Sequence, residues 1–175
     1  PNRRTLLRVA LLCLALPAAP LLPAHALAAE VIVFGGSGKL GAEVVRSLLA
    51  ADRGATVFHR ERSDLSRLQG LKLQFAIGDA TVERDVQAAF AAHRYDVAIN
   101  ALAKGRSEPV AFYETTQRLI TAASKATGVK QVILHSSVGA GDSRAVYPQA
   151  IWPRMKDVLL AKDVAERELI ASGVP

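Results

Sequence analysis

The stretch Val31-Ile32-Val33-Phe34-Gly35-Gly36-Ser37-Gly38-Lys39-Leu40-Gly41 decides the fold of this chain. Its apolar start predicts a buried strand, its glycines predict a tight turn, and the residues that follow begin a helical pattern. This order suits a dinucleotide pyrophosphate, because glycines let the backbone approach the phosphates and the first helical turn offers unpaired N–H groups. Gly35, Gly38 and Gly41 recur every three residues, and the alternative interpretation is a glycine-rich turn that binds nothing.

Strand-like and helical patterns alternate from Glu30 onward, which predicts an α/β fold. We expect strands at 31–34, 56–59, 73–77, 97–101 and 131–136. Helices are expected at 40–52, 82–93 and 114–127, with Gly54 and Gly128 as left-handed residues at helix ends. The pattern is typical of a doubly wound parallel sheet of the Rossmann type, in a single domain spanning residues 30–175. A helix followed by the first residues of another strand closes the sequence, so we expect a chain that is C-terminally truncated.

Residues 1–29 have the pattern of an export signal. A basic start, with Arg3, Arg4 and Arg8, precedes an apolar run from Val9 to Leu16 and two Ala-x-Ala cleavage candidates. The paired arginines resemble a bacterial twin-arginine signal, which carries folded proteins to the periplasm. A general secretory signal, an uncleaved anchor and a lipoprotein signal at Cys13 are the alternatives. Prolines interrupt the apolar run too early for a spanning helix, so no membrane contact is expected after cleavage.

Composition and charge exclude several other classes of protein. The chain has 175 residues and a formal net charge of +6, of which the three arginines of the signal supply half. The remaining charges are interspersed, so nucleic-acid binding is not expected. Cys13 is the only cysteine and the four histidines match no ligand spacing, so no metal site is expected. The oligomeric state is not predicted.

The end of the second predicted strand indicates which dinucleotide binds. NAD-preferring sites carry an acid there to bind the ribose hydroxyls, whereas this chain has His59-Arg60. A guanidinium suits a 2′-phosphate, which favours NADP over NAD. Glu61 keeps NAD possible, and an ordinary solvated arginine is the alternative interpretation of Arg60.

Taken in order, these features resemble the short-chain dehydrogenase/reductase superfamily, in its atypical NmrA-like NAD(P)-binding branch. The resemblance runs from about Val31 to Val174. It rests on the glycine stretch, on His59-Arg60 and on four further motifs: Gly78-Asp79-Ala80-Thr81, Asp96-Val97-Ala98-Ile99-Asn100-Ala101, Val132-Ile133-Leu134-His135-Ser136-Ser137, and the closing 160–173 segment.

The resemblance implies a set of cofactor-binding residues. Gly35, Ser37, Gly38, Lys39 and Leu40 would line the pyrophosphate, with Gly41 packing the helix closely on the strand. Arg60 would hold the 2′-phosphate, and Asp79 and Ala80 would flank the adenine. Asn100, Ala101 and Leu102 would run beside the ribose. For Asp79, a turn or helix-capping role without a ligand is an equal alternative.

The resemblance also implies a catalytic set, which is incomplete here. Catalytic members combine a Ser or Thr, a Tyr and a Lys four residues after that Tyr. Ser137 and Lys162 fill two of these places, and Lys162 would also hold the nicotinamide ribose. Val158 stands where the phenol is expected. Tyr147 is a conceivable substitute from a loop, although packing is the more common role of such an aromatic residue.

Two functions follow from these residues, ahead of sugar-nucleotide epimerase or dehydratase chemistry, whose enzymes usually keep the tyrosine. The first is an atypical NAD(P)H-binding reductase that transfers hydride to a small carbonyl, quinone or flavin-like acceptor. The second is an NADP-binding redox sensor or assembly factor without turnover, which the missing tyrosine favours.

Overall fold

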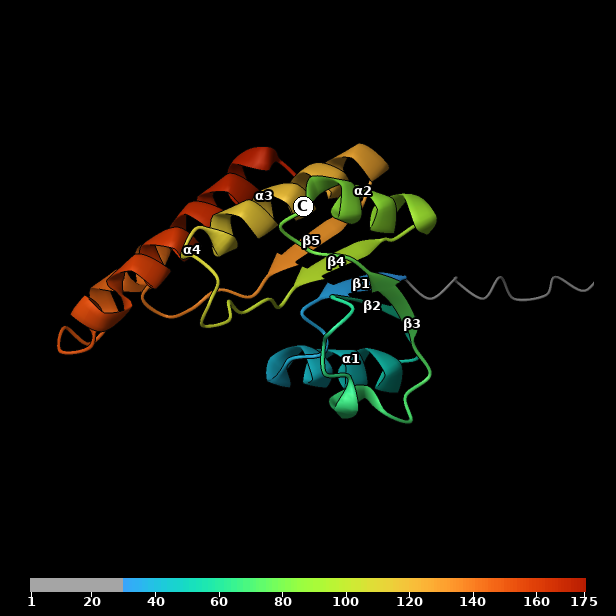
Figure 1. Ribbon diagram of the computed structural model, residues 1–175. Coiled ribbons are helices and arrows are strands. Elements are labelled where there is room, and N and C mark those ends of the chain that lie inside the picture. The colour runs from blue at the N-terminus through green and yellow to red at the C-terminus, as the bar shows by residue number, and fades with distance from the viewer. Residues whose placement is uncertain (1–29) are drawn as a thin grey trace, which may run out of the picture.

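The structure is a computed structural model that describes residues 30–175, so the predicted export signal lies outside the described residues. Strands and helices alternate along the described chain (Figure 1). The strands are β1 (Val31–Phe34), β2 (Ala55–His59), β3 (Gln74–Ile77), β4 (Val97–Asn100) and β5 (Gln131–Leu134). The helices are α1 (Lys39–Ala50), α2 (Glu83–Ala92), α3 (Phe112–Thr127) and α4 (Trp152–Ser172), with 3-10 turns η1 (Ser66–Leu68) and η2 (Gly141–Val146).

The strands form one parallel sheet in the order β3-β2-β1-β4-β5. The chain leaves β1 in one direction for β2 and β3 and then crosses to the other side for β4 and β5. The carboxyl ends of β1, β2 and β4 are level, because Phe34 pairs in register with both Phe58 and Asn100. Doubly wound sheets bind ligands at the carboxyl ends of the strands, where the strand order reverses. Here that point lies between the carboxyl ends of β1 and β4.

Helices cover both faces of the sheet, with α1 on one face and α2, α3 and α4 on the other (Figure 1). Side chains alternate between faces along a strand, and β1 shows this directly. Ile32 and Phe34 join the core beneath the three-helix layer, whereas Val31 and Val33 join the core beneath α1. All four are buried, which is why β1 reads as a continuous apolar run.

The predicted fold class is confirmed, and the predicted element bounds differ from the observed ones by at most two residues. Gly128 is left-handed at the end of α3, with φ 72°. The expectation for Gly54 is wrong: the left-handed residue after α1 is Asp52, with φ 55°. The nearest atom to a Cβ on Gly54 would be a carboxylate oxygen of the partly exposed Glu30 side chain, at 2.6 Å.

The final residues lie beside β5, because Val132 N donates a 2.7 Å hydrogen bond to Pro175 O. Across residues 30–175, no helix combines the length and the apolar character that crossing a membrane requires.

Candidate functional site

The glycine turn lies directly after β1 and leads into α1. Gly35 has φ 79°, and a Cβ on it would lie 2.7 Å from Ala101 O at the end of β4. Gly38 N donates to Gly35 O at 3.0 Å, which closes the turn, and the first helical bond runs from Ala42 N to Gly38 O. The amides of residues 39–41 therefore have no partner within the helix, and the positive end of the helix dipole faces the same edge.

Gly41 holds the helix against this turn. A Cβ there would lie 2.7 Å from both Gly35 C and Gly36 Cα, which are backbone atoms that cannot rotate away. The residue is buried and does not line the cavity described below. Its role is close packing, as the sequence analysis expected, and its contribution to a bound dinucleotide is to position the amides beside it.

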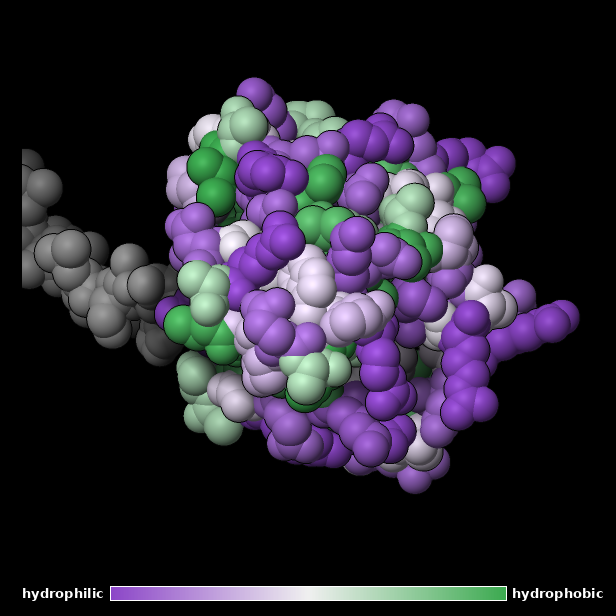
Figure 2. All heavy atoms as spheres, turned by 90° about the vertical axis from the view of Figure 1, so that its left-hand side faces the viewer, coloured by the Kyte–Doolittle hydropathy of each residue, from purple (hydrophilic) through white to green (hydrophobic). Residues whose placement is uncertain are grey.

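A cavity of about 460 Å³ runs along the carboxyl edge of the sheet, from the residues after β2 and β3 past the glycine turn to the end of β5. The face of the molecule that Figure 2 shows is mainly hydrophilic, with hydrophobic residues scattered over it. Ten of the residues expected to bind the cofactor line this cavity: Gly35, Ser37, Gly38, Lys39, Leu40, Arg60, Asp79, Ala80, Ala101 and Leu102. Predicted site residues that do not line it are Gly41, Asn100, Ser137 and Lys162.

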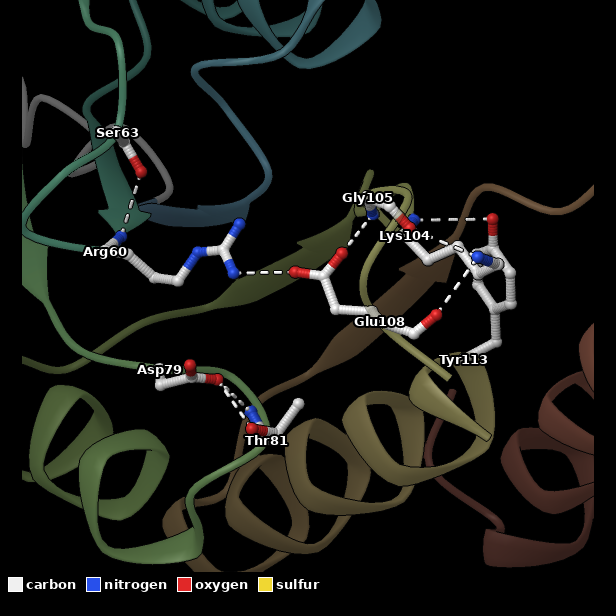
Figure 3. Close-up of polar contacts among 8 residues, drawn as sticks. All are labelled: Arg60, Ser63, Asp79, Thr81, Lys104, Gly105, Glu108 and Tyr113. Atoms are coloured by element: carbon white, nitrogen blue, oxygen red, sulfur yellow. Dashed lines mark hydrogen bonds and ion pairs between the residues drawn. The ribbon is translucent and has the colours of Figure 1, made fainter. Parts of the chain in front are cut away.

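Arg60 extends from the end of β2 toward the loop that follows β4 (Figure 3). Its Nη1 lies 2.6 Å from Oε1 of Glu108, and its backbone N–H donates to Ser63 Oγ at 3.1 Å. The Arg60 side chain remains 60% exposed, whereas that of Glu108 is only 16% exposed. The sequence predicts a guanidinium at this position, and the structure adds that it is paired with a carboxylate.

Asp79 has the turn role that the sequence left open, and it also lines the cavity. Its Oδ1 accepts hydrogen bonds from Thr81 N at 2.8 Å and Thr81 Oγ1 at 2.7 Å, which stabilise the turn before α2 (Figure 3). No side chain caps the N-terminus of α2 itself. Burial raises the pKa of the Asp79 carboxyl, but the bonds from Thr81 and the charge of Arg60 outweigh it, so the pKa lies below its usual value. Asp79 thus stays ionised while lining the cavity.

Asn100 supports the site from inside the protein. The residue is 3% exposed, its Nδ2 donates to Gln117 Oε1 at 2.8 Å, and its Oδ1 accepts from Leu102 N at 3.1 Å. Both ends of the amide are therefore engaged by the protein. Asn100 shapes the turn after β4 that presents Ala101 and Leu102 to the cavity, rather than contacting it directly.

Lys162 projects from α4 toward the end of β5 and is 7% exposed. Its Nζ donates to His135 O at 3.4 Å and lies 4.6 Å from the centre of the Tyr113 ring. Burial lowers the pKa of the Lys162 ammonium, and nearby Glu166 partly opposes this change. The pKa of His135, which lines the cavity, is lowered by partial burial and then by the charge of Lys162.

The two serines after β5 differ in accessibility. Ser137 is exposed, whereas the Ser136 hydroxyl is buried without a hydrogen-bond partner in the described part of the chain. Val158 is half-buried one helical turn before Lys162, and Tyr147 packs against Gly139 and lies edge-on to Trp152. The aromatic ring beside Lys162 is that of Tyr113, from α3, which the spacing to a following lysine gave no reason to select.

Residues 35–175 match a family described as NAD(P)H-binding. The chain belongs to this family, and the predicted NAD(P)-binding family is confirmed. No group of His, Cys, Asp and Glu side chains within residues 30–175 is arranged to hold a metal ion.

Three known proteins show the extent of the similarity. Sterol demethylase protein B of Methylococcus capsulatus is 28% identical over 153 residues, which cover 82% of this chain and 47% of that protein. The structure of ChuY, an anaerobilin reductase from Escherichia coli O157:H7, matches with a TM-score of 0.68 at 24% identity, covering 80% of this chain and 66% of that chain. The structure of WbmG of Bordetella bronchiseptica, solved with NAD, matches with a TM-score of 0.71 at 16% identity, covering 88% of this chain and 53% of that chain.

These two structures share the fold of this chain. The chain spans about half the length of the curated relative.

Proposed function

We propose that this chain is the cofactor-binding part of an NADPH-dependent reductase that acts on a small carbonyl, quinone or flavin-like acceptor. The single observation that carries the proposal is the continuous cavity from Arg60, past the free amides after Gly38, to His135 at the end of β5. A dinucleotide placed along it has its pyrophosphate at the positive end of α1. Its adenosine then lies between Arg60 and Asp79, and its nicotinamide lies toward β5.

In this proposal, residues near the β5 end of the cavity hold the nicotinamide ribose and the acceptor. When bound, NADPH supplies a hydride, and the acceptor takes up one proton in addition, which leaves NADP⁺ and the reduced acceptor. Lys162 would hold the nicotinamide ribose through its ammonium, and Ser137 would anchor the acceptor through its exposed hydroxyl. With valine at position 158, the proton comes from water, Ser137 or the substrate itself. The reductase name of the E. coli fold neighbour is consistent with this class of reaction.

Turnover distinguishes this proposal from its alternative. Full-length protein is mixed with NADPH and a panel of carbonyls, quinones, flavins and anaerobilin, and the loss of NADPH is followed. The proposal expects consumption with at least one acceptor. Tight NADPH binding without consumption by any of them supports a non-catalytic redox sensor or assembly factor, which Val158 in the place of the phenol favours.

The preference for NADPH rests on Arg60. Calorimetry should give a lower dissociation constant for NADPH than for NADH, because the guanidinium pairs with the 2′-phosphate. Arg60→Glu should narrow the gap, and Arg62→Glu, which changes a neighbouring charge by the same amount, is the control. Equal affinities in the unmodified protein would refute this preference.

Export by the twin-arginine route is a further part of the proposal, supported by Arg3, Arg4 and the apolar run after them. A fusion of residues 1–29 to a reporter that is active only after folded export tests it. Replacement of both arginines by lysine should abolish reporter activity in the periplasm. Reporter activity that survives this replacement, or no activity in the periplasm with both arginines in place, would overturn the twin-arginine assignment.

A further inference from the structure

We propose that Glu108 competes with the 2′-phosphate of the cofactor for Arg60 and thereby reduces the selectivity of the site for NADP over NAD. The inference rests on the proposed function, because it takes Arg60 as the residue that binds the 2′-phosphate. It concerns a residue that the sequence analysis did not select and that lies on a different loop from Arg60.

The ion pair joins the loops on either side of the point where the strand order reverses. Arg60 follows β2 and Glu108 lies in the loop between β4 and α3, while β1 runs between those two strands. The distance of 2.6 Å between Arg60 Nη1 and Glu108 Oε1 is that of a charge-assisted hydrogen bond. Glu108 therefore occupies one of the guanidinium N–H donors that a phosphate would otherwise use.

Glu108 is the fixed member of the pair. Its second carboxylate oxygen accepts a hydrogen bond from Gly105 N, and its backbone oxygen accepts one from Lys104 Nζ at 3.1 Å (Figure 3). The Lys104 ammonium also donates to Gly105 O at 3.1 Å, and Lys104 N donates to the Tyr113 hydroxyl at 3.4 Å. These bonds hold the loop together, whereas the Arg60 side chain is mostly exposed and free to turn.

Two carboxylates, those of Glu108 and Asp79, line one cavity together with Arg60. This second cavity, of about 240 Å³, is also lined by Phe112. A phosphate entering there meets two carboxylates, and it must draw the guanidinium away from Glu108 or share it. The ribose 2′-hydroxyl of NAD carries no charge and donates a hydrogen bond to a carboxylate, so Glu108 does not oppose NAD in this way.

The test compares dissociation constants of NADP⁺ and NAD⁺, measured by calorimetry on the full chain. Glu108→Gln keeps an acceptor for Gly105 N and removes the charge. We expect it to tighten NADP⁺ binding about two- to five-fold, the range for a partly exposed ion pair, and to leave NAD⁺ unchanged or weaker. Glu83→Gln is the matched control, because it also keeps a hydrogen-bond acceptor and removes an equal charge, from an exposed residue that has no ion pair within residues 30–175 and lines neither cavity.

A double-mutant cycle with Arg60→Gln identifies the cause. If Glu108 acts by competing for the guanidinium, its substitution changes the NADP⁺ to NAD⁺ ratio only when Arg60 is present. The inference is overturned if Glu108→Gln leaves or lowers that ratio, or if Glu83→Gln raises it equally. It is also overturned if the effect persists without Arg60.

These outcomes differ from a failure of the proposed function. If the unmodified chain binds neither dinucleotide, both the function and the inference are refuted. If it binds both and the ratio does not respond to Glu108, only the inference is refuted.

Discussion

Gly38 precedes α1 and Gly41 lies in its first turn, and the structure predicts different consequences when each is replaced by alanine. A Cβ on Gly41 would lie 2.7 Å from two backbone carbons, Gly35 C and Gly36 Cα. Carbon atoms in contact normally lie about 3.5–4.0 Å apart, so α1 must move outward by roughly 1 Å. Overpacking of this kind costs about 1–3 kcal/mol, and we expect the upper end because backbone atoms cannot change rotamer.

Gly38 is in an extended conformation that any residue adopts, with φ −73° and ψ 172°. The nearest atom to a Cβ there is Gly35 O, at 3.2 Å. Gly38→Ala should therefore change the free energy of unfolding by less than about 1 kcal/mol. The added methyl group lies at the wall of the cavity, so the affinity for NADPH should fall by at least about tenfold, which corresponds to 1.4 kcal/mol.

Urea denaturation followed by circular dichroism, together with calorimetric titration of NADPH, separates the two effects. Gly41→Ala should lower the free energy of unfolding, and Gly38→Ala should lower affinity with little loss of stability. The reasoning is refuted if Gly41→Ala is as stable as the unmodified protein. It is also refuted if Gly38→Ala destabilises the chain as much as Gly41→Ala does.

Two further predictions concern charged residues. Lys162→Met should lower NADPH affinity but change the free energy of unfolding by no more than about 1 kcal/mol. The lost cation–π contact and the long hydrogen bond are offset because a buried ammonium no longer has to be desolvated. If paired denaturation and titration experiments show a loss of stability without a loss of affinity, Lys162 has a structural role instead. Because the folded-state pKa of Asp79 is below its usual 3.8, its ionised form stabilises the fold fully above that value, and the contribution is lost as the pH falls through the folded-state pKa. The difference in unfolding free energy between the unmodified chain and Asp79→Asn should thus be constant from neutral pH to about pH 5 and shrink at lower pH, and a difference that grows on acidification would contradict this sign.

The local parts of the site were predictable from the sequence because local patterns encode them. The apolar run of β1, the glycine turn and the start of α1 are consecutive, and Arg60 follows directly from the end of β2. In a parallel sheet the carboxyl ends of strands meet at one edge, so the fold alone brings Asp79 and Ala101 near the glycine turn.

Contacts between distant loops were not predictable in this way. Glu108 lies in a loop with no periodic pattern, and its pairing with Arg60 depends on how two loops meet above the sheet. Tyr113 contacts Lys162 because α3 and α4 pack together, which no spacing between a tyrosine and a lysine records. Asn100 was expected to run beside the ribose. Its amide instead bonds to the buried Gln117, on the helix α3 that follows β4, and this partner directs the amide into the protein interior.

The most direct test of the central claim is a crystal structure of the full chain grown with NADP⁺. We predict one dinucleotide along the carboxyl edge of the sheet, with its 2′-phosphate on Arg60, its pyrophosphate on the amides after Gly38 and its nicotinamide ribose within hydrogen-bond distance of Lys162. A dinucleotide bound elsewhere, or in the reverse direction along this edge, would contradict the account.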